Sequence, residues 1–208
     1  MIEGFFPATA MPDPDWWEAL WPRPGEVLVG LGLEPHMEVV DLCCGDGLFT
    51  APLARMVQHV VAIDLDRRML DLAQAKVAAA GAENCEFIEA NAYDVADWVS
   101  RPIAFVLMAN TFHGVPEKER LARAVAAILR PGGRFAVVNW HRRPRQETTV
   151  LGQPRGPGTN LRMEPEDVVA AVEPAGLTFA RVVEFPPYHY GAIFQKTVAY
   201  PHGFSHGF

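Results

Sequence analysis

The sequence Glu38-Val39-Val40-Asp41-Leu42-Cys43-Cys44-Gly45-Asp46-Gly47-Leu48-Phe49-Thr50 decides how this chain folds. Its apolar beginning predicts a short strand, and its two glycines predict a tight turn that leads into a helix. A second apolar run, 60–63, predicts another strand and ends at Asp64. Strand, glycine turn, helix, strand and acid in this order are typical of a βαβ unit that binds a nucleotide.

The chemistry of the turn narrows the choice of ligand. Gly45 and Gly47 have no Cβ atom, so a ligand can lie against bare backbone. Asp41 and Asp46 would repel a pyrophosphate and attract a cation, and Thr50 stands where the dinucleotide motif has its third glycine. S-adenosylmethionine (SAM) carries a sulfonium and an ammonium group. The turn therefore favours SAM, and an NAD-type oxidoreductase is the weaker alternative.

The run Asp41–Gly47 resembles the cofactor loop of the class I SAM-dependent methyltransferases. It looks most like the ubiquinone/menaquinone C-methyltransferase-like branch, in which cysteine often replaces the first glycine. A second point of similarity is a helix that ends at Arg130–Gly133 and is followed directly by a strand. The chain differs from the family at Ala104, because family members commonly have an acid there, at the start of the fourth strand. The resemblance covers about residues 15–198. It implies an α/β, Rossmann-like fold whose seven-stranded sheet is mostly parallel, with helices on both faces and the last strand antiparallel.

The resemblance also implies a cofactor site at the carboxyl ends of the strands. Asp41 would lie near the ammonium group, and Asp64 would accept hydrogen bonds from the ribose hydroxyls. Asn91 would face the amino edge of adenine, although it can also be an ordinary turn residue. The implied cofactor residues are Asp41, Cys43, Gly45, Gly47, Asp64, Leu65, Asn91, Ala92 and Asn110.

His113 is the candidate catalytic residue on the substrate side. It follows the apolar run 103–109, and a histidine there can accept a proton if the methyl acceptor arrives protonated. The alternative is a histidine that only bonds a loop carbonyl. The predicted substrate pocket consists of Trp16, Trp17, His113, His141, Tyr188 and Tyr190.

Composition divides the chain into three parts and one unusual loop. Residues 1–36 are rich in aromatic residues and proline, and form either a lid or a segment stapled onto the core, with Asp15 as the expected cap of a short helix through Leu20. Residues 37–200 form the methyltransferase domain, whose last strand is expected at about 191–199 after a loop at 186–190. Residues 201–208 form a flexible or partner-docked tail. Residues 141–163 hold five arginines and one acid. This loop is either a flexible insert or a contact for an anionic substrate or partner.

The overall composition excludes several classes of protein. The 208 residues suit one domain, and the net charge of −7 argues against affinity for nucleic acid. Three cysteines without metal-ligand spacing predict no metal site and a reducing, cytoplasmic location. No apolar run is long enough to span a membrane, and the first residues do not resemble a secretory signal. We expect a monomer or homodimer.

These observations predict a SAM-dependent methyltransferase that acts on a small apolar or aromatic molecule by in-line transfer, with the acceptor atom left open. The alternative is a non-catalytic module that binds SAM or a nucleotide and engages a partner through loop 141–163.

Overall fold

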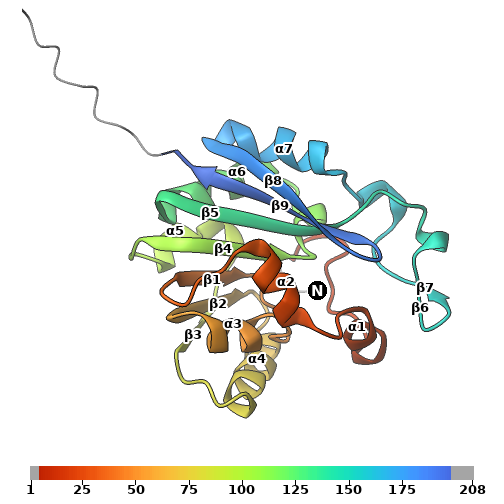
Figure 1. Cartoon of the computed structure of the whole chain (residues 1–208), viewed down its shortest axis with the longest axis horizontal. Coiled ribbons are helices and arrows are strands. Elements are labelled where there is room, and N and C mark those ends of the chain that lie inside the picture. The colour runs from red at the N-terminus through yellow and green to blue at the C-terminus, as the bar shows by residue number, and fades with distance from the viewer. Residues whose placement is uncertain (1–4, 198–208) are drawn as a thin grey trace, which may run out of the picture.

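A seven-stranded sheet with the order β3-β2-β1-β4-β5-β9-β8 forms the centre of the structure, a computed structural model that describes residues 5–197 (Figure 1). All neighbouring strands are parallel except at β9, which runs antiparallel to both β5 and β8. The predicted fold class is thereby confirmed. Residues 198–200 and the predicted tail 201–208 lie outside the described residues. The strands of the sheet are β1 (Glu38–Leu42), β2 (His59–Asp64), β3 (Cys85–Glu89), β4 (Ile103–Ala109), β5 (Leu129–Trp140), β8 (Leu177–Phe185) and β9 (His189–Lys196).

Two apolar cores cover the two faces of this sheet. Side chains alternate along each strand, so Val39 packs into the core beneath α1, α2 and α3, whereas Val40 packs into the core beneath α5, α6 and α7. Because the central strands are buried on both faces, their sequences are continuously apolar. The helices are α1 (Pro14–Leu20), α2 (Pro24–Leu31), α3 (Thr50–Met56), α4 (Arg67–Ala79), α5 (Val95–Trp98), α6 (Lys118–Ile128) and α7 (Pro165–Val172).

Some element boundaries differ from the sequence prediction. The cap of α1 is Asp13 rather than Asp15, because the Asp13 carboxylate accepts a hydrogen bond from the Asp15 N–H at 3.0 Å. The last strand begins at His189, where pairing with Trp140 starts, and not at residue 191. This shift matters for the site, because it moves His189 and Tyr190 out of a predicted loop and into the sheet.

The sheet order reverses between β1 and β4, since β2 and β3 lie on one side of this pair and β5 on the other. The carboxyl ends of the strands meet at one rim there, and open α/β sheets bind ligands at such a point. The loops after β1, β2, β3 and β4 are therefore brought together although they are far apart in sequence.

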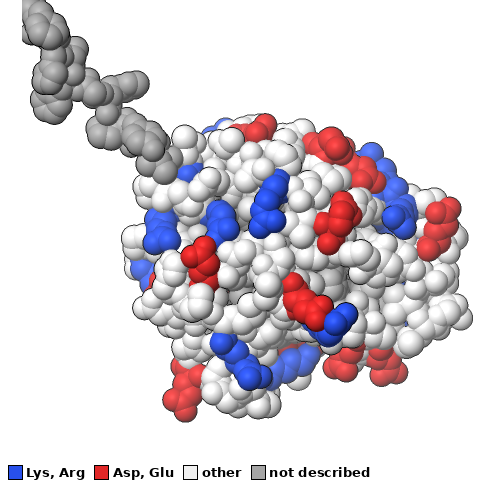
Figure 2. Space-filling model, viewed as in Figure 1, with Lys and Arg blue, Asp and Glu red and all other residues white. Residues whose placement is uncertain are grey.

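Loop 141–163 contains a small hairpin between β6 (Thr149–Val150) and β7 (Gln153–Pro154), close to α1 (Figure 1). None of the described helices reaches the length and hydrophobicity that crossing a bilayer requires. On the face drawn in Figure 2, acidic and basic side chains are interspersed rather than gathered by sign.

Gly47 marks the closest approach of the turn after β1 to α4. Its φ angle is +83°, and a Cβ atom added there would lie 2.6 Å from the Cα atom of Ala73. Thus Gly47 is required for packing against α4. Gly81 has a similar φ angle of +73°, yet an added Cβ atom would meet nothing within 4 Å.

We therefore expect Gly47→Ala to lower the free energy of unfolding by about 2–5 kcal/mol, because it combines left-handed backbone strain with overpacking. Gly81→Ala is the matched control, and should cost only about 1–2 kcal/mol from the strain alone. Urea denaturation of both variants measures the difference. Equal losses would show that contact with Ala73 does not set the requirement for glycine.

Candidate active site

A cavity of about 1000 Å³ lies at the carboxyl rim of the sheet. Its floor is formed by the ends of β1, β2 and β4 and the loops behind them. Residues 5–12 and α1 cover it on one side, and part of loop 141–163 covers it on another. The volume is at the upper end of the roughly 300–1,000 Å³ range of ligand sites, so there is room for a cofactor and a second molecule.

Asp41 lies at the end of β1 with its side chain almost fully buried. It is 2% exposed, and one carboxylate oxygen accepts a hydrogen bond from the Thr50 hydroxyl at 2.6 Å. Burial, opposed by the Thr50 hydrogen bond and assisted by the nearby charge of Asp64, raises the pKa of Asp41 to about 7. A cation beside Asp41 would favour the ionised form.

Asp64 holds the turn after β1 against the end of β2. Its Oδ2 atom accepts a hydrogen bond from the Gly45 N–H, and its Oδ1 atom accepts one from the Asp66 N–H, both at 2.9 Å. Burial raises the pKa of Asp64, although these backbone hydrogen bonds oppose the shift. The carboxylate lines the cavity and is thus fixed in place by the backbone on both sides.

Leu65, Asn91 and Ala92, three of the predicted cofactor residues, also line the cavity. The Oδ1 atom of Asn91 accepts a hydrogen bond from the Tyr93 N–H at 3.1 Å and caps the short helix that begins at Ala92. Asn91 therefore has the turn role that the sequence left open. A carbonyl oxygen has a second lone pair, so this bond leaves the predicted contact with adenine possible.

Asn110, directly after β4, has unsatisfied polar groups at the cavity wall. Its φ angle is +60°, and its backbone N–H donates to the Val138 carbonyl at 2.8 Å. Both polar atoms of its side chain are buried without a hydrogen-bond partner among the described residues. Buried polar groups are rarely left unpaired, so the Asn110 amide offers a donor and an acceptor to a ligand in the cavity.

His113 lies in the cavity lining and contacts the N-terminal segment. Its Nε2–H donates to the Ala8 carbonyl at 3.2 Å, which leaves the lone pair of a neutral ring on Nδ1. Burial lowers the pKa of His113, and the nearby charge of Lys118 contributes in the same direction. The histidine is therefore neutral at pH 7, and it makes the loop-carbonyl contact that was the alternative reading of the sequence.

Residues 6–11 line the cavity and contain a turn at Pro7 and Ala8, where the φ angle of Ala8 is +58°. The Phe6 ring meets the Tyr93 ring edge to face at 5.4 Å. A Cβ atom at Gly45 would lie 3.1 Å from the Met11 sulfur, so the segment approaches the turn after β1 closely. Trp16 and Trp17 also line the cavity and are 9% and 7% exposed. These aromatic residues are thus core and cavity wall at once.

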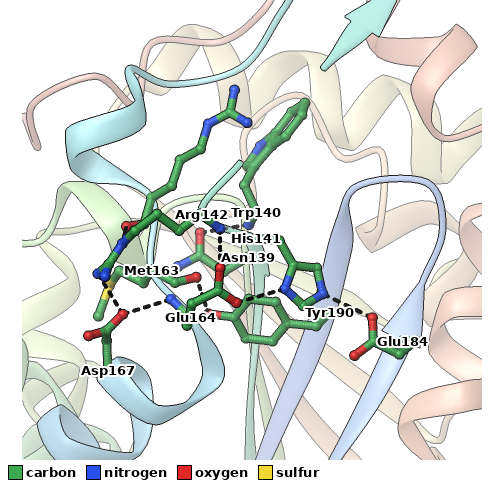
Figure 3. A network of polar contacts seen from close by, with 10 residues as sticks. Asn139, Trp140, His141, Arg142, Met163, Glu164, Asp167, Glu184 and Tyr190 are labelled. Atoms are coloured by element: carbon green, nitrogen blue, oxygen red, sulfur yellow. Dashed lines mark hydrogen bonds and ion pairs between the residues drawn. The ribbon is translucent and has the colours of Figure 1, made fainter. Parts of the chain in front are cut away.

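Four residues of the predicted site lie outside the cavity lining. Gly47 packs closely against Ala73 of α4. Tyr190 is buried in β9 and donates to the Met163 carbonyl at 2.9 Å, while His141 is held between Glu164 and Glu184 (Figure 3). Tyr188 stacks on Trp140 with ring centroids 5.9 Å apart. The positions of His141, Tyr188 and Tyr190 depend on where β9 begins and on the path of loop 141–163, and the sequence pattern did not reveal either.

Arg162 organises loop 141–163 from its interior. Its side chain is 1% exposed, and its guanidinium lies 4.9 Å from the centre of the Trp140 ring. Burial lowers the pKa of Arg162 to about 10, which leaves it charged at neutral pH. No carboxylate pairs with it in residues 5–197. Its hydrogen bonds go to the carbonyls of Pro157, Arg143 and Arg155 and to the Thr148 hydroxyl.

Other residues at the cavity were absent from the predicted site. Residues 5–12 and Trp140 belong to it, as do Arg145 and Arg155 of the loop. The position of Trp140 at the end of β5 could have identified it. The excess of arginine in loop 141–163 was the available signal for Arg145 and Arg155. Within the described ranges, no cluster of three or more His, Cys, Asp or Glu could hold a metal ion.

The cavity fits an adenosyl ligand that carries positive charge. The ends of β1 and β2 present buried carboxylates and a left-handed glycine at position 45, and the end of β4 presents the unpaired amide of Asn110. Carboxylates are suited to ribose hydroxyls and to an ammonium group, and the glycine admits close contact with backbone.

Comparisons with known proteins agree with this fit. A methyltransferase-domain family matches residues 39–133. A solved SAM-dependent methyltransferase from Aquifex aeolicus is 26% identical, with a TM-score of 0.72 over 88% of this chain and 93% of that one. The tRNA 5-carboxymethoxyuridine methyltransferase of Escherichia coli K12 is 29% identical over 115 residues, which are 55% of this chain and 44% of that protein. A ubiquinone/menaquinone biosynthesis C-methyltransferase of Escherichia fergusonii is 30% identical over 113 residues, 52% and 45% respectively. The chain thus spans less than half the length of these two curated relatives.

The His141 bridge predicts how stability depends on pH. Burial alone would lower the pKa of His141, but hydrogen bonds to Glu164 and Glu184, each 2.9 Å long, outweigh it and raise the pKa. A histidine with a raised pKa in the folded state stabilises the fold fully below its unfolded pKa of about 6.5. This stabilisation is lost as the pH rises through the folded value.

We expect the stability difference between wild type and His141→Gln to be largest below pH about 6.5 and to shrink toward pH 8. Urea unfolding at several pH values measures it. His113 and His189 have lowered pKa values that act in the opposite direction, and both proteins retain these residues. Taking the difference removes their shared contribution and leaves only the repulsion between His189 and the charged His141. A difference that does not change with pH would contradict the bridge.

Proposed function

We propose that this chain is a class I SAM-dependent methyltransferase that takes SAM as its cofactor and transfers the methyl group of SAM to a small apolar or aromatic molecule. One observation carries the proposal: a single cavity joins a carboxylate-lined end to an aromatic end. When bound, SAM supplies an electrophilic methyl carbon that a nucleophile attacks in line with the departing sulfur.

In this proposal, the carboxylate end holds the cofactor. Asp64 accepts from the ribose hydroxyls, and Gly45 admits the ligand against backbone. Leu65 and Ala92 enclose the adenine with Asn91 at its amino edge, while Asp41 and the Asn110 amide serve the charged end of the methionine part. Cys43, whose φ angle of +60° places it in the same turn, contributes to the wall.

The aromatic end holds the acceptor. Trp16 and Trp17 provide flat apolar walls, and methyl transfer needs chiefly alignment and exclusion of water. His113 is the proton acceptor of this proposal, through Nδ1, when the nucleophile carries a proton. Support comes from its neutral state and from its place in the lining.

The N-terminal segment is the lid of this proposal. It crosses the cavity between the cofactor turn and His113, so both ligands have to pass it or displace it. Segments that cover sites in this way exclude water during reaction and open for exchange.

The alternative function, a non-catalytic module that engages a partner through loop 141–163, has less support. Arg142 forms an ion pair with Asp167 at 2.6 Å, and the guanidinium of Arg162 is buried in the loop, where it donates to the Arg143 carbonyl. The loop therefore presents fewer free cations than its sequence suggests.

Asp64→Ala should weaken SAM binding at least about tenfold, because it removes the charged acceptor assigned to the ribose. Isothermal titration with SAM measures the effect. Asp71→Ala is the matched control, since Asp71 lies on the exposed side of α4 and pairs only with Arg67 among the described residues. An unchanged affinity in Asp64→Ala would remove Asp64 from the cofactor site.

Two further measurements test the function itself. Failure of the intact protein to bind SAM would overturn the proposal. Formation of S-adenosylhomocysteine (SAH) above background, with a panel of small aromatic and quinone acceptors, would support it. SAM binding without turnover on any acceptor would favour the non-catalytic alternative.

A further inference from the structure

The cavity is electrostatically divided. Four carboxylates line it, and all belong to the ends of β1 and β2 or the residues beside them: Asp41, Asp46, Asp64 and Asp66. Three arginines also line it. Arg68 is paired with Asp66 at 2.7 Å, whereas Arg145 and Arg155 come from loop 141–163 and form no ion pair within residues 5–197. One end thus suits a cation, and the other end offers two unpaired cations.

Hydrogen bonds fix the backbone of Arg155, and its side chain lies at the cavity with an unpaired donor. Its backbone N–H donates to the Thr148 carbonyl at 2.9 Å, and its carbonyl accepts from Arg162 and from the Thr148 hydroxyl, each at 3.0 Å. Its guanidinium lies 5.4 Å from the centre of the Trp16 ring. The Nε atom is buried and has no acceptor among the described residues. A buried donor without an acceptor destabilises the protein, so we expect a bound ligand to supply the acceptor for Nε.

Two neighbouring groups present donors in the same region. The Nε–H of Arg145 donates to the Gly156 carbonyl at 3.0 Å, which fixes the side chain at the cavity mouth. The indole N–H of Trp17 is buried without a partner in the described part of the chain. All of these groups donate, and none accepts. The matching ligand group is therefore rich in acceptors and negatively charged.

Resting on the proposed function, we propose that the methyl acceptor is a small aromatic acid whose carboxylate is bound by Arg155 and Arg145. The flat ring lies among the tryptophans, and the planar guanidinium matches a carboxylate through two parallel hydrogen bonds. The charge division then orients both ligands, because the cationic cofactor and the anionic acceptor are each favoured at one end only.

The burial of the Arg155 donor favours a small acid over an anionic macromolecule. Residues 5–12 and the loop line the cavity together with Arg155, whose Nε atom is buried rather than on an open surface. A chain with a net charge of −7 also lacks the broad positive field that attracts nucleic acid.

The test measures binding of matched aromatic acids and their uncharged primary amides, such as hydroxylated benzoates, naphthoates and indole carboxylates. Titrations use the full chain with and without saturating SAH. We expect wild type to bind the best acids about tenfold or more tightly than their amides, because a charged hydrogen bond replaces a neutral one. Arg155→Gln should abolish this preference and Arg145→Gln should reduce it, while SAH affinity stays unchanged.

Arg143→Gln is the matched control. Arg143 belongs to the same loop, is exposed and does not line the cavity, so the preference for acids should persist. Binding of SAH without a preference for any acid over its amide would overturn this inference and leave the proposed function standing. A preference that survives in Arg155→Gln would also overturn it. A parallel series of aryl phosphates shows whether the arginines prefer a carboxylate or a phosphate. Tight binding of the phosphates alone would refute the carboxylate assignment. Absence of SAH binding would refute the proposed function instead.

Discussion

The hydrogen bond from the Gly45 N–H to the Asp64 carboxylate is the contact on which the site depends. It joins the turn after β1 to the end of β2, so two segments separated by a helix form one wall. The second oxygen of Asp64 accepts from the backbone of Asp66 and fixes the start of α4 in the same place. A charged group buried in this way needs both bonds, because burial without partners would be costly. The same carboxylate is then available in a fixed position at the cavity.

Much of the cofactor end of the cavity could be predicted because its residues lie close together in the sequence. Strand, glycine turn and acid lie within 27 residues, and the rule that parallel strands end at one rim brings them together. Gly47 shows the limit of that reasoning. Its sequence position suggested contact with a ligand, whereas its physical reason is the closeness of Ala73 in α4. A motif can identify a glycine without saying which neighbour demands it.

The substrate end was harder to predict because it depends on long-range contacts. A shift of two residues in the start of β9 moved Tyr190 into the sheet, and the ion pairs of His141 reach Glu164 and Glu184, 23 and 43 residues away. Loop 141–163 looked flexible by composition. Its order comes from one buried guanidinium that binds backbone carbonyls, and counting charges does not distinguish Arg162 from Arg155. Only the three-dimensional path separates the arginine that builds the loop from those that face the cavity.

The tryptophans give this architecture an optical consequence. Three of the five, Trp16, Trp17 and Trp140, line the cavity, and Trp21 lies against both Trp17 and His189. Trp98 is 55% exposed. Three of the five indole fluorophores of the protein therefore lie in the wall of the cavity. Entry of a ligand or movement of the N-terminal segment changes the surroundings of these indoles directly, so the unlabelled chain carries its own fluorescent reporter of occupancy.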